Sequence, residues 1–134
     1  MNRNPITLLT AQIPPISPPT NTELIRGISL SNKEINIILN VIKDITPEYS
    51  VWLFGSRYWG TNKKFSDVDL AFIGNERLTI EKRAKLLDAF SESDLPYFVD
   101  IVDYNSVSQE FRDIIDKGSS ELRISNSELR IQNT

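Results

Sequence analysis

The sequence predicts an α+β domain in which helices pack on a small mixed sheet. Segments with apolar residues at helical spacing alternate with short apolar runs of strand length. The chain of 134 residues also has the usual length of one domain. We expect the order helix, strand, strand, helix, strand, helix within residues 29–118.

The first helix is the element with the clearest start signal. Ser31 and Glu34 have the spacing of a capping box, in which the serine is the N-cap and the glutamate is the third helical residue. Pro47 closes the segment. The apolar positions at helical spacing are Ile35, Ile38, Leu39 and Ile42.

The remaining elements follow from apolar runs and amphipathic spacing. Strands are predicted at 50–54, 67–73 and 98–104. The helix at 79–90 is expected to bury Ile80, Ala84, Leu87 and Phe90, and the helix at 108–117 is expected to bury Phe111, Ile114 and Ile115 before it stops at Gly118. The connection 56–66 is long for a plain hairpin, which is typical of a functional segment.

Both ends of the chain differ from this pattern. Residues 1–28 form a proline-rich arm, for which we expect extended backbone in solvent or a segment that docks on a partner. Residues 119–134 are an extension that contains the repeat SELRISN and SELRIQN. Two copies are too few for a coiled coil, so the extension is either non-essential or a partner-binding helix.

The composition excludes several classes of function. The chain has no Cys and no His, which removes thiol nucleophiles, zinc–thiolate sites and imidazole bases. The formal net charge of −3 disfavours long nucleic acids, which require a basic face. Apolar runs are too short for a membrane span, and prolines interrupt the N-terminus where a signal peptide would continue. We therefore expect a cytoplasmic protein.

Three aspartates are the candidate metal ligands. Asp67 and Asp69 are two residues apart on a predicted strand, so their side chains face the same way. Adjacent carboxylates repel, and their natural use is to bind a hard divalent cation. Asp100 lies on a later strand and is the preferred third ligand, with Asp103 as the alternative. The two face opposite ways on a regular strand, so only one of them can join the site. Three such groups suit a site for two metal ions.

Gly55 and Ser56 are the candidate phosphate-binding residues. Glycine lets the backbone approach a phosphate closely, and the serine hydroxyl can donate to a phosphate oxygen. Arg57 either contacts a phosphate or pins the turn. Lys63, together with Lys64, either attracts the triphosphate or belongs to a solvated loop tip.

These residues carry a resemblance to a known family. Gly55-Ser56, ten intervening residues and Asp67-Val68-Asp69 resemble the defining motif of the DNA polymerase β-like nucleotidyltransferases. The surrounding stretches GSRYWG, SDVDL and FVDIVDYNSVSQEFRDIIDKG resemble the minimal nucleotidyltransferases, the MntA-type antitoxins that pair with HEPN-domain toxins. The resemblance covers roughly Ser31 to Gly118.

The resemblance implies a role for each motif residue. Asp67 and Asp69 would ligate two Mg²⁺ ions, Asp100 would ligate the catalytic ion and help deprotonate the acceptor, and Ser56 at the Gly55 turn would grip the β and γ phosphates. The implied reaction transfers AMP from ATP to a tyrosine of the toxin, and the alternative is an inactive member that neutralises the toxin by contact. The strand with which the family often ends is not visible after Gly118, and the proline-rich arm and the repeats are not part of the family pattern.

Overall fold

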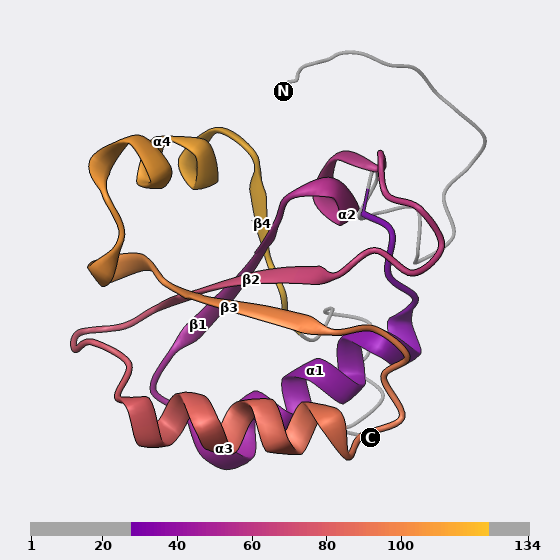
Figure 1. Ribbon diagram of the computed structural model, residues 1–134, viewed down its shortest axis with the longest axis horizontal. Coiled ribbons are helices and arrows are strands. Elements are labelled where there is room, and N and C mark those ends of the chain that lie inside the picture. Colours follow the sequence, from indigo (N-terminus) through magenta and orange to yellow (C-terminus); the bar gives the residue numbers. More distant parts are fainter. Residues whose placement is uncertain (1–27, 124–134) are drawn as a thin grey trace, which may run out of the picture.

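A mixed sheet with helices on both faces organises the chain (Figure 1). The structure, a computed structural model, describes residues 28–123. In that range the strand order is β3-β2-β1-β4, which confirms the predicted fold class. The elements are α1 Asn32–Ile45, β1 Ser50–Phe54, α2 Ser56–Trp59, β2 Val68–Ile73, α3 Ile80–Ser91, β3 Val99–Asp103, the 3-10 turn η3 Tyr104–Ser106, α4 Gln109–Lys117 and β4 Ser119–Glu121.

Helix α1 begins with the predicted capping box. The Glu34 amide donates to Ser31 Oγ at 3.1 Å, and the Ser31 amide donates to Glu34 Oε1 at 2.9 Å. These two bonds satisfy amide groups that a helix start leaves without partners. Ile35, Ile38 and Ile42 are buried under the sheet, as the spacing predicts.

The two faces of the sheet have different covers. Leu53, Leu70 and Ile101 belong to the larger core, which α1 and α3 close. On the opposite face, Ala71 is buried with Ile115 of α4. Because side chains alternate along a strand, Asp69 lies on the same face as Ala71, two residues nearer the start of β2. Helix α4 therefore covers only part of this face and leaves Asp69 half-exposed.

Helix α3 presents a different face to the core from the one that the sequence predicts. Leu86 and Phe90 are buried, whereas Ile80 is 86% exposed, Leu87 is 42% exposed and Ala84 is also exposed. Of the four residues that the sequence predicts to be buried in this helix, only Phe90 is buried. The side chain of Arg83 also reaches the sheet, and its Nη1 donates to the carbonyl of Ile101 on β3 at 2.6 Å. Long stems of this kind pack on apolar surface while the charged end reaches a partner.

Helix α4 also departs from the prediction at one position. Ile115 is buried and Phe111 packs beside it, as expected, but Ile114 is 60% exposed. A helix that packs on one face of a sheet buries only a narrow stripe of side chains. Of the two adjacent residues Ile114 and Ile115, one therefore faces solvent and the other faces the core.

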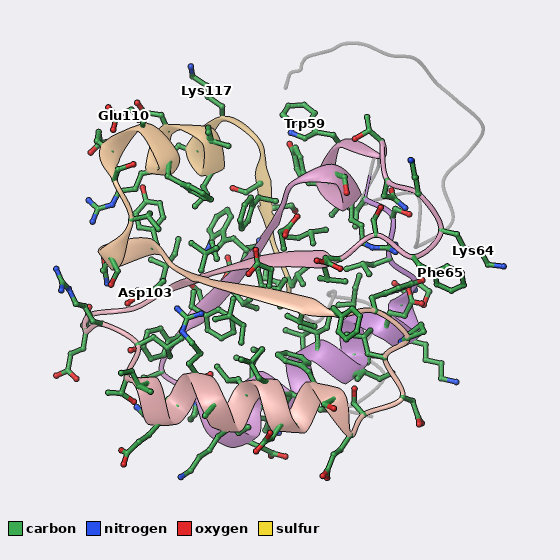
Figure 2. All side chains as sticks on the ribbon, in the orientation of Figure 1. Trp59, Lys64, Phe65, Asp103, Glu110 and Lys117 are labelled. Atoms are coloured by element: carbon green, nitrogen blue, oxygen red, sulfur yellow. The ribbon has the colours of Figure 1, made fainter. Side chains whose placement is uncertain are left out.

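The strand expected to be missing after Gly118 is present. Strand β4 pairs antiparallel with β1, and Leu122 is 4% exposed with its amide bonded to the Val51 carbonyl at 3.0 Å. The sheet therefore includes Ser119–Glu121, which the sequence assigns to the extension. The ring of Trp59 packs against Gly118 at the start of this strand, where a Cβ would clash (Figure 2). The rest of the repeat lies outside the described residues, as does nearly all of the proline-rich arm.

Candidate active site

The corner between β1 and α2 is built around Gly55. Its φ of +76° is one that residues with a side chain rarely adopt, and a Cβ there would overlap the carboxyl group of Asp69. Phe54 and Asp69 are also partners in the antiparallel register of β1 and β2. The glycine therefore brings the backbone before Ser56 directly against the Asp69 carboxylate.

Strands β2 and β3 bring Asp69 and Asp100 to one face, whereas Asp67 directly precedes β2 and is not part of the strand as predicted. Asp69 and Asp100 are direct partners in the parallel register, so their side chains point to the same side of the sheet. Asp67 and Asp69 flank Val68, which is fully buried on the other side. Asp67 and Asp100 are exposed. The strand pairing that the three-carboxylate prediction requires is thus present.

The electrostatics of this cluster are set by burial and like charge. Burial, followed by the negative charges of Asp100 and Asp67, raises the pKa of Asp69 to about 6. As the side chains lie, no three acidic groups within residues 28–123 are gathered closely enough to ligate one ion. The cluster is therefore a set of mutually repelling carboxylates that a cation would stabilise.

Arg57 has an architectural role in this structure. It is 2% exposed, and its guanidinium donates to the carbonyls of Ser29 at 2.9 Å, Ser66 at 3.0 Å and Lys64 at 3.1 Å. The ring of Tyr97 stacks on the guanidinium at 3.7 Å. These contacts fit the alternative that Arg57 pins the turn.

Tyr97 is a supporting residue that the sequence analysis missed. Its hydroxyl donates to Glu34 Oε2 at 2.9 Å, so the capping box of α1 is connected through Tyr97 to Arg57 and the loop before Asp67. The signal available in the sequence is weak, because a tyrosine after Pro96 is equally common in an ordinary loop.

The loop lysines lie where a loop tip is expected. Lys63 and Lys64 are exposed. The Lys63 backbone is fixed by Ser66, whose Oγ accepts from the Lys63 amide at 2.8 Å. Their side chains are thus placed in solvent on an anchored loop, and Lys63 remains a prediction as a phosphate ligand.

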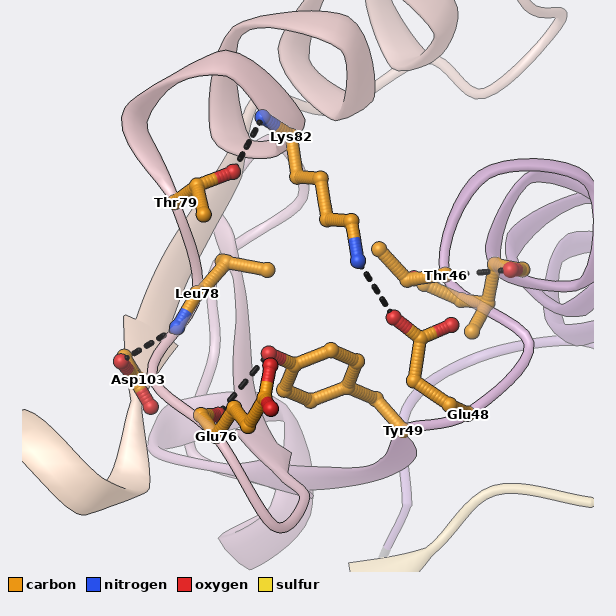
Figure 3. Close-up of polar contacts among 9 residues, drawn as sticks. Thr46, Glu48, Tyr49, Glu76, Leu78, Thr79, Lys82 and Asp103 are labelled. Carbon is orange, nitrogen blue, oxygen red and sulfur yellow. Dashed lines mark hydrogen bonds and ion pairs between the residues drawn. The ribbon is translucent and has the colours of Figure 1, made fainter.

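Asp103, the alternative third ligand, has a different function. It is 3% exposed and accepts hydrogen bonds from the Asn105 amide at 3.1 Å and the Ser106 hydroxyl at 2.8 Å. It also accepts from the Leu78 amide at 2.8 Å (Figure 3). These donors hold the loop before α3 and the turn η3. Asp103 is therefore a structural residue, and Asp100 is the carboxylate of β3 that faces Asp69.

A hollow near Tyr49 is a poorer candidate for binding a triphosphate than the Gly55-Ser56 corner. A space of about 280 Å³ is lined by Glu48, Tyr49, Asn75 and Glu76, at the end of β1 opposite to Gly55. The Tyr49 hydroxyl donates to the Glu76 carbonyl at 2.8 Å, and Lys82 pairs with Glu48 (Figure 3). The two acidic side chains disfavour a triphosphate.

Among the described residues, no helix is long and apolar enough to cross a membrane.

Comparison with known proteins identifies the class. The family model described as "Polymerase beta, Nucleotidyltransferase" matches residues 31–128, so the chain belongs to this family. Gly55-Ser56 and the three aspartates lie within that match.

One named relative and two solved structures show which kinds of protein in this family the chain resembles. The chain is 44% identical over 90 residues to the probable protein adenylyltransferase MntA of Haemophilus influenzae, covering 67% of this chain and 79% of the relative. It resembles a solved toxin–antitoxin complex with AMP-PNP, with 26% identity, a TM-score of 0.59 and coverage of 72% of this chain and 78% of that one. A complex of a tri-AMPylated Shewanella oneidensis HEPN toxin with an MNT antitoxin has the same fold, with 22% identity, a TM-score of 0.56 and coverage of 76% and 79%.

Proposed function

We propose that this protein is a Mg²⁺-dependent adenylyltransferase that transfers AMP from ATP to a tyrosine hydroxyl of a cognate HEPN toxin. It would act in the cytoplasm as the antitoxin of that pair. The observation that carries the proposal is the in-register pair Asp69 and Asp100, in which the Asp69 carboxyl lies against Gly55.

Asp67, Asp69 and Asp100 would hold the two Mg²⁺ ions. Carboxylate oxygens are the ligands that Mg²⁺ prefers. The raised pKa of Asp69, caused by burial and by its two acidic neighbours, marks a cluster that lacks positive charge. Bound Mg²⁺ would neutralise the phosphates and the charge that develops on the transferring group.

The Gly55-Ser56 corner and Lys63 would bind the triphosphate. The Ser56 hydroxyl would donate to a phosphate oxygen, since the glycine brings this backbone beside Asp69. Lys63 would attract the triphosphate from its exposed position on the loop. Arg57 would act on nucleotide binding indirectly, by fixing that loop through its three carbonyl contacts.

Asp100 would accept the proton of the acceptor hydroxyl. The acceptor oxygen bonds to the α-phosphorus, the bond from that phosphorus to the bridging oxygen breaks, and pyrophosphate leaves. A tyrosine suits this step in a chain without His, because its hydroxyl has a pKa of about 10 and releases its proton more readily than an aliphatic alcohol.

The relatives support the same reaction class. One is named a protein adenylyltransferase, and a solved neighbour is a toxin–antitoxin complex with AMP-PNP, an analogue of ATP. Together with the family match, these names favour ATP as the nucleotide and a protein as the acceptor.

A contact-only antitoxin is the second candidate function. The observation that favours it is that the acidic side chains within residues 28–123 are not gathered around one ion position. In that case the same fold would neutralise the toxin by binding alone. The double variant Asp67→Asn, Asp69→Asn separates the two: contact predicts that it still protects cells from the toxin, and catalysis predicts that it does not.

The direct test is label transfer. The full chain is incubated with Mg²⁺, the HEPN protein encoded beside it and ATP labelled at the α-phosphate. We expect label on the toxin, none when the label is at the γ-phosphate, and none in EDTA. Absence of transfer by a folded pair would contradict the proposal.

A further inference from the structure

Two aromatic side chains stand in solvent just before the starts of β2 and β3. Phe98 is 83% exposed and Phe65 is 69% exposed. Figure 2 shows Phe65 with Lys64 at the outer end of the loop that leads into β2. Lys64 Nζ lies 5.3 Å from the centre of the Phe65 ring, so the positive charge and the apolar ring form one surface.

Phe65 and Phe98 precede two neighbouring strands, β2 and β3. The Phe98 carbonyl accepts from the Val68 amide at 2.9 Å, which joins the starts of β2 and β3. Phe98 precedes Asp100 by two residues, so by strand alternation it lies on the carboxylate side of the sheet. Its high exposure agrees, because the opposite side is the core.

The order of the strands indicates which substrate would approach the start of β3. In phosphoryl transfer the attacking and leaving oxygens lie on opposite sides of the phosphorus. Ser56 follows β1, Asp69 is on β2, and Asp100 is on β3. If pyrophosphate leaves toward Ser56, the acceptor arrives on the β3 side, which Phe98 borders.

The outer edge of β3 favours docking by side chains. The outward carbonyl of Ile101 is already occupied by Arg83 Nη1 at 2.6 Å. A partner strand would have to displace this bond to extend the sheet there. The exposed rings at the entry to the strands remain accessible.

We propose that Lys64, Phe65 and Phe98 form the docking surface for the segment of the acceptor protein that presents its hydroxyl. The surface fits an apolar side chain next to a carboxylate, which would pack on the two rings and pair with Lys64. A base would use the rings but has no negative charge for Lys64, so a protein segment is the better match. This inference rests on the proposed function for the identity of the acceptor.

The test compares two double variants of the full chain. Phe65→Ser, Phe98→Ser removes the rings of the proposed surface. Ile80→Ser, Leu87→Ser is the matched control, because it removes two exposed apolar side chains on the far helix α3. For each we would measure the Kd of the HEPN protein without nucleotide, the KM for that protein and the KM for ATP.

We expect the phenylalanine variant to raise the Kd and the KM for the acceptor protein about tenfold or more, which is the size of effect that exposed aromatic anchors give. Its KM for ATP should stay within about twofold of wild type, and the control variant should match wild type. A Lys64→Glu variant should weaken acceptor binding in the same direction.

Two results overturn the inference. A raised KM for ATP with unchanged acceptor binding would make the rings a platform for the base, and unchanged values for both substrates would leave the surface without a role. If wild type transfers no label, the proposed function fails, and the Kd comparison still decides whether this surface binds the partner.

Discussion

Asp100 and Asp103 lie three residues apart on one strand and have opposite environments. Asp103 is buried and accepts three hydrogen bonds, whereas Asp100 is exposed beside another acidic side chain. The first arrangement satisfies a buried charge, and the second concentrates negative charge at an accessible face. The comparison shows that the partners of an aspartate, more than its spacing in the sequence, distinguish a structural role from a chemical one.

The largest expected effect separates these two aspartates. Asp100→Asn should lower AMP transfer by about 1,000-fold or more with little change in stability, because it removes a proton acceptor and a metal ligand. Asp103→Asn should lower the free energy of unfolding by about 1–3 kcal/mol, because one oxygen that accepts hydrogen bonds is replaced by an amide donor. Single-turnover rates and urea unfolding measure the two effects. Equal rates of AMP transfer for the two variants would contradict the distinction between a chemical role for Asp100 and a structural role for Asp103.

Gly55→Ala should give the next largest effect. The added Cβ would overlap the Asp69 carboxyl and is strained at a φ of +76°. We expect transfer to fall about 100-fold, as displacement of a reacting group by about 1 Å can cause. The measurement is kcat/KM for ATP, with Gly74→Ala as a control that perturbs Tyr49, at the opposite end of β1. An active Gly55→Ala variant would show that the corner tolerates a shift of Asp69.

Arg57→Lys should destabilise the loop without touching the carboxylates. Lysine retains the positive charge but lacks the planar guanidinium that donates to three carbonyls. The buried charge would therefore have fewer hydrogen-bond partners. We expect a loss of about 2 kcal/mol in unfolding free energy and a raised KM for ATP. Lys63→Ala is the comparison: it should raise this KM while leaving stability unchanged. The opposite pattern would make Arg57 a direct phosphate ligand.

The smallest effect concerns Asp69 in the metal-free protein. Its pKa rises from 3.8 to about 6 on folding, because of burial and the charges of Asp100 and Asp67. A carboxyl whose pKa is raised on folding stabilises the protein only while protonated, and this contribution is lost as the pH rises through about 6. Asp69→Asn should therefore stabilise the metal-free protein above that pH by about 1 kcal/mol, a figure reduced for partial exposure.

Thermal melting in EDTA at several pH values measures this gain. It should be present at pH 8 and shrink toward pH 4, while the same variant loses AMP transfer. A variant that is less stable than wild type at pH 8 would contradict the electrostatic origin.

Local signals explain what could be predicted from the sequence. The capping box of α1 depends on residues three apart, and the side of the sheet on which Asp69 lies follows from strand alternation alone. The face of α3 could not be read in this way, because Arg83 reaches a carbonyl of β3 that is distant in sequence. Strand β4 has the sequence Ser-Ser-Glu, without an apolar pattern, and forms because the edge of β1 accepts it.

The site shows the same division between local and tertiary information. The residue types of the motif indicate metal and phosphate chemistry, but the use of Arg57 depends on carbonyls that the fold brings around it. Likewise, only the burial of Asp103 and its three donors decide between the two aspartates of β3.

The most direct test of the acidic cluster is the change in melting temperature on adding Mg²⁺ with a non-hydrolysable ATP analogue. At about 100 times Kd, wild type and Asp103→Asn should each gain roughly 10 °C over their own metal-free values. Asp100→Asn should gain far less. A wild-type protein that does not respond, or an Asp100→Asn variant that responds fully, would contradict a nucleotide site built on these carboxylates.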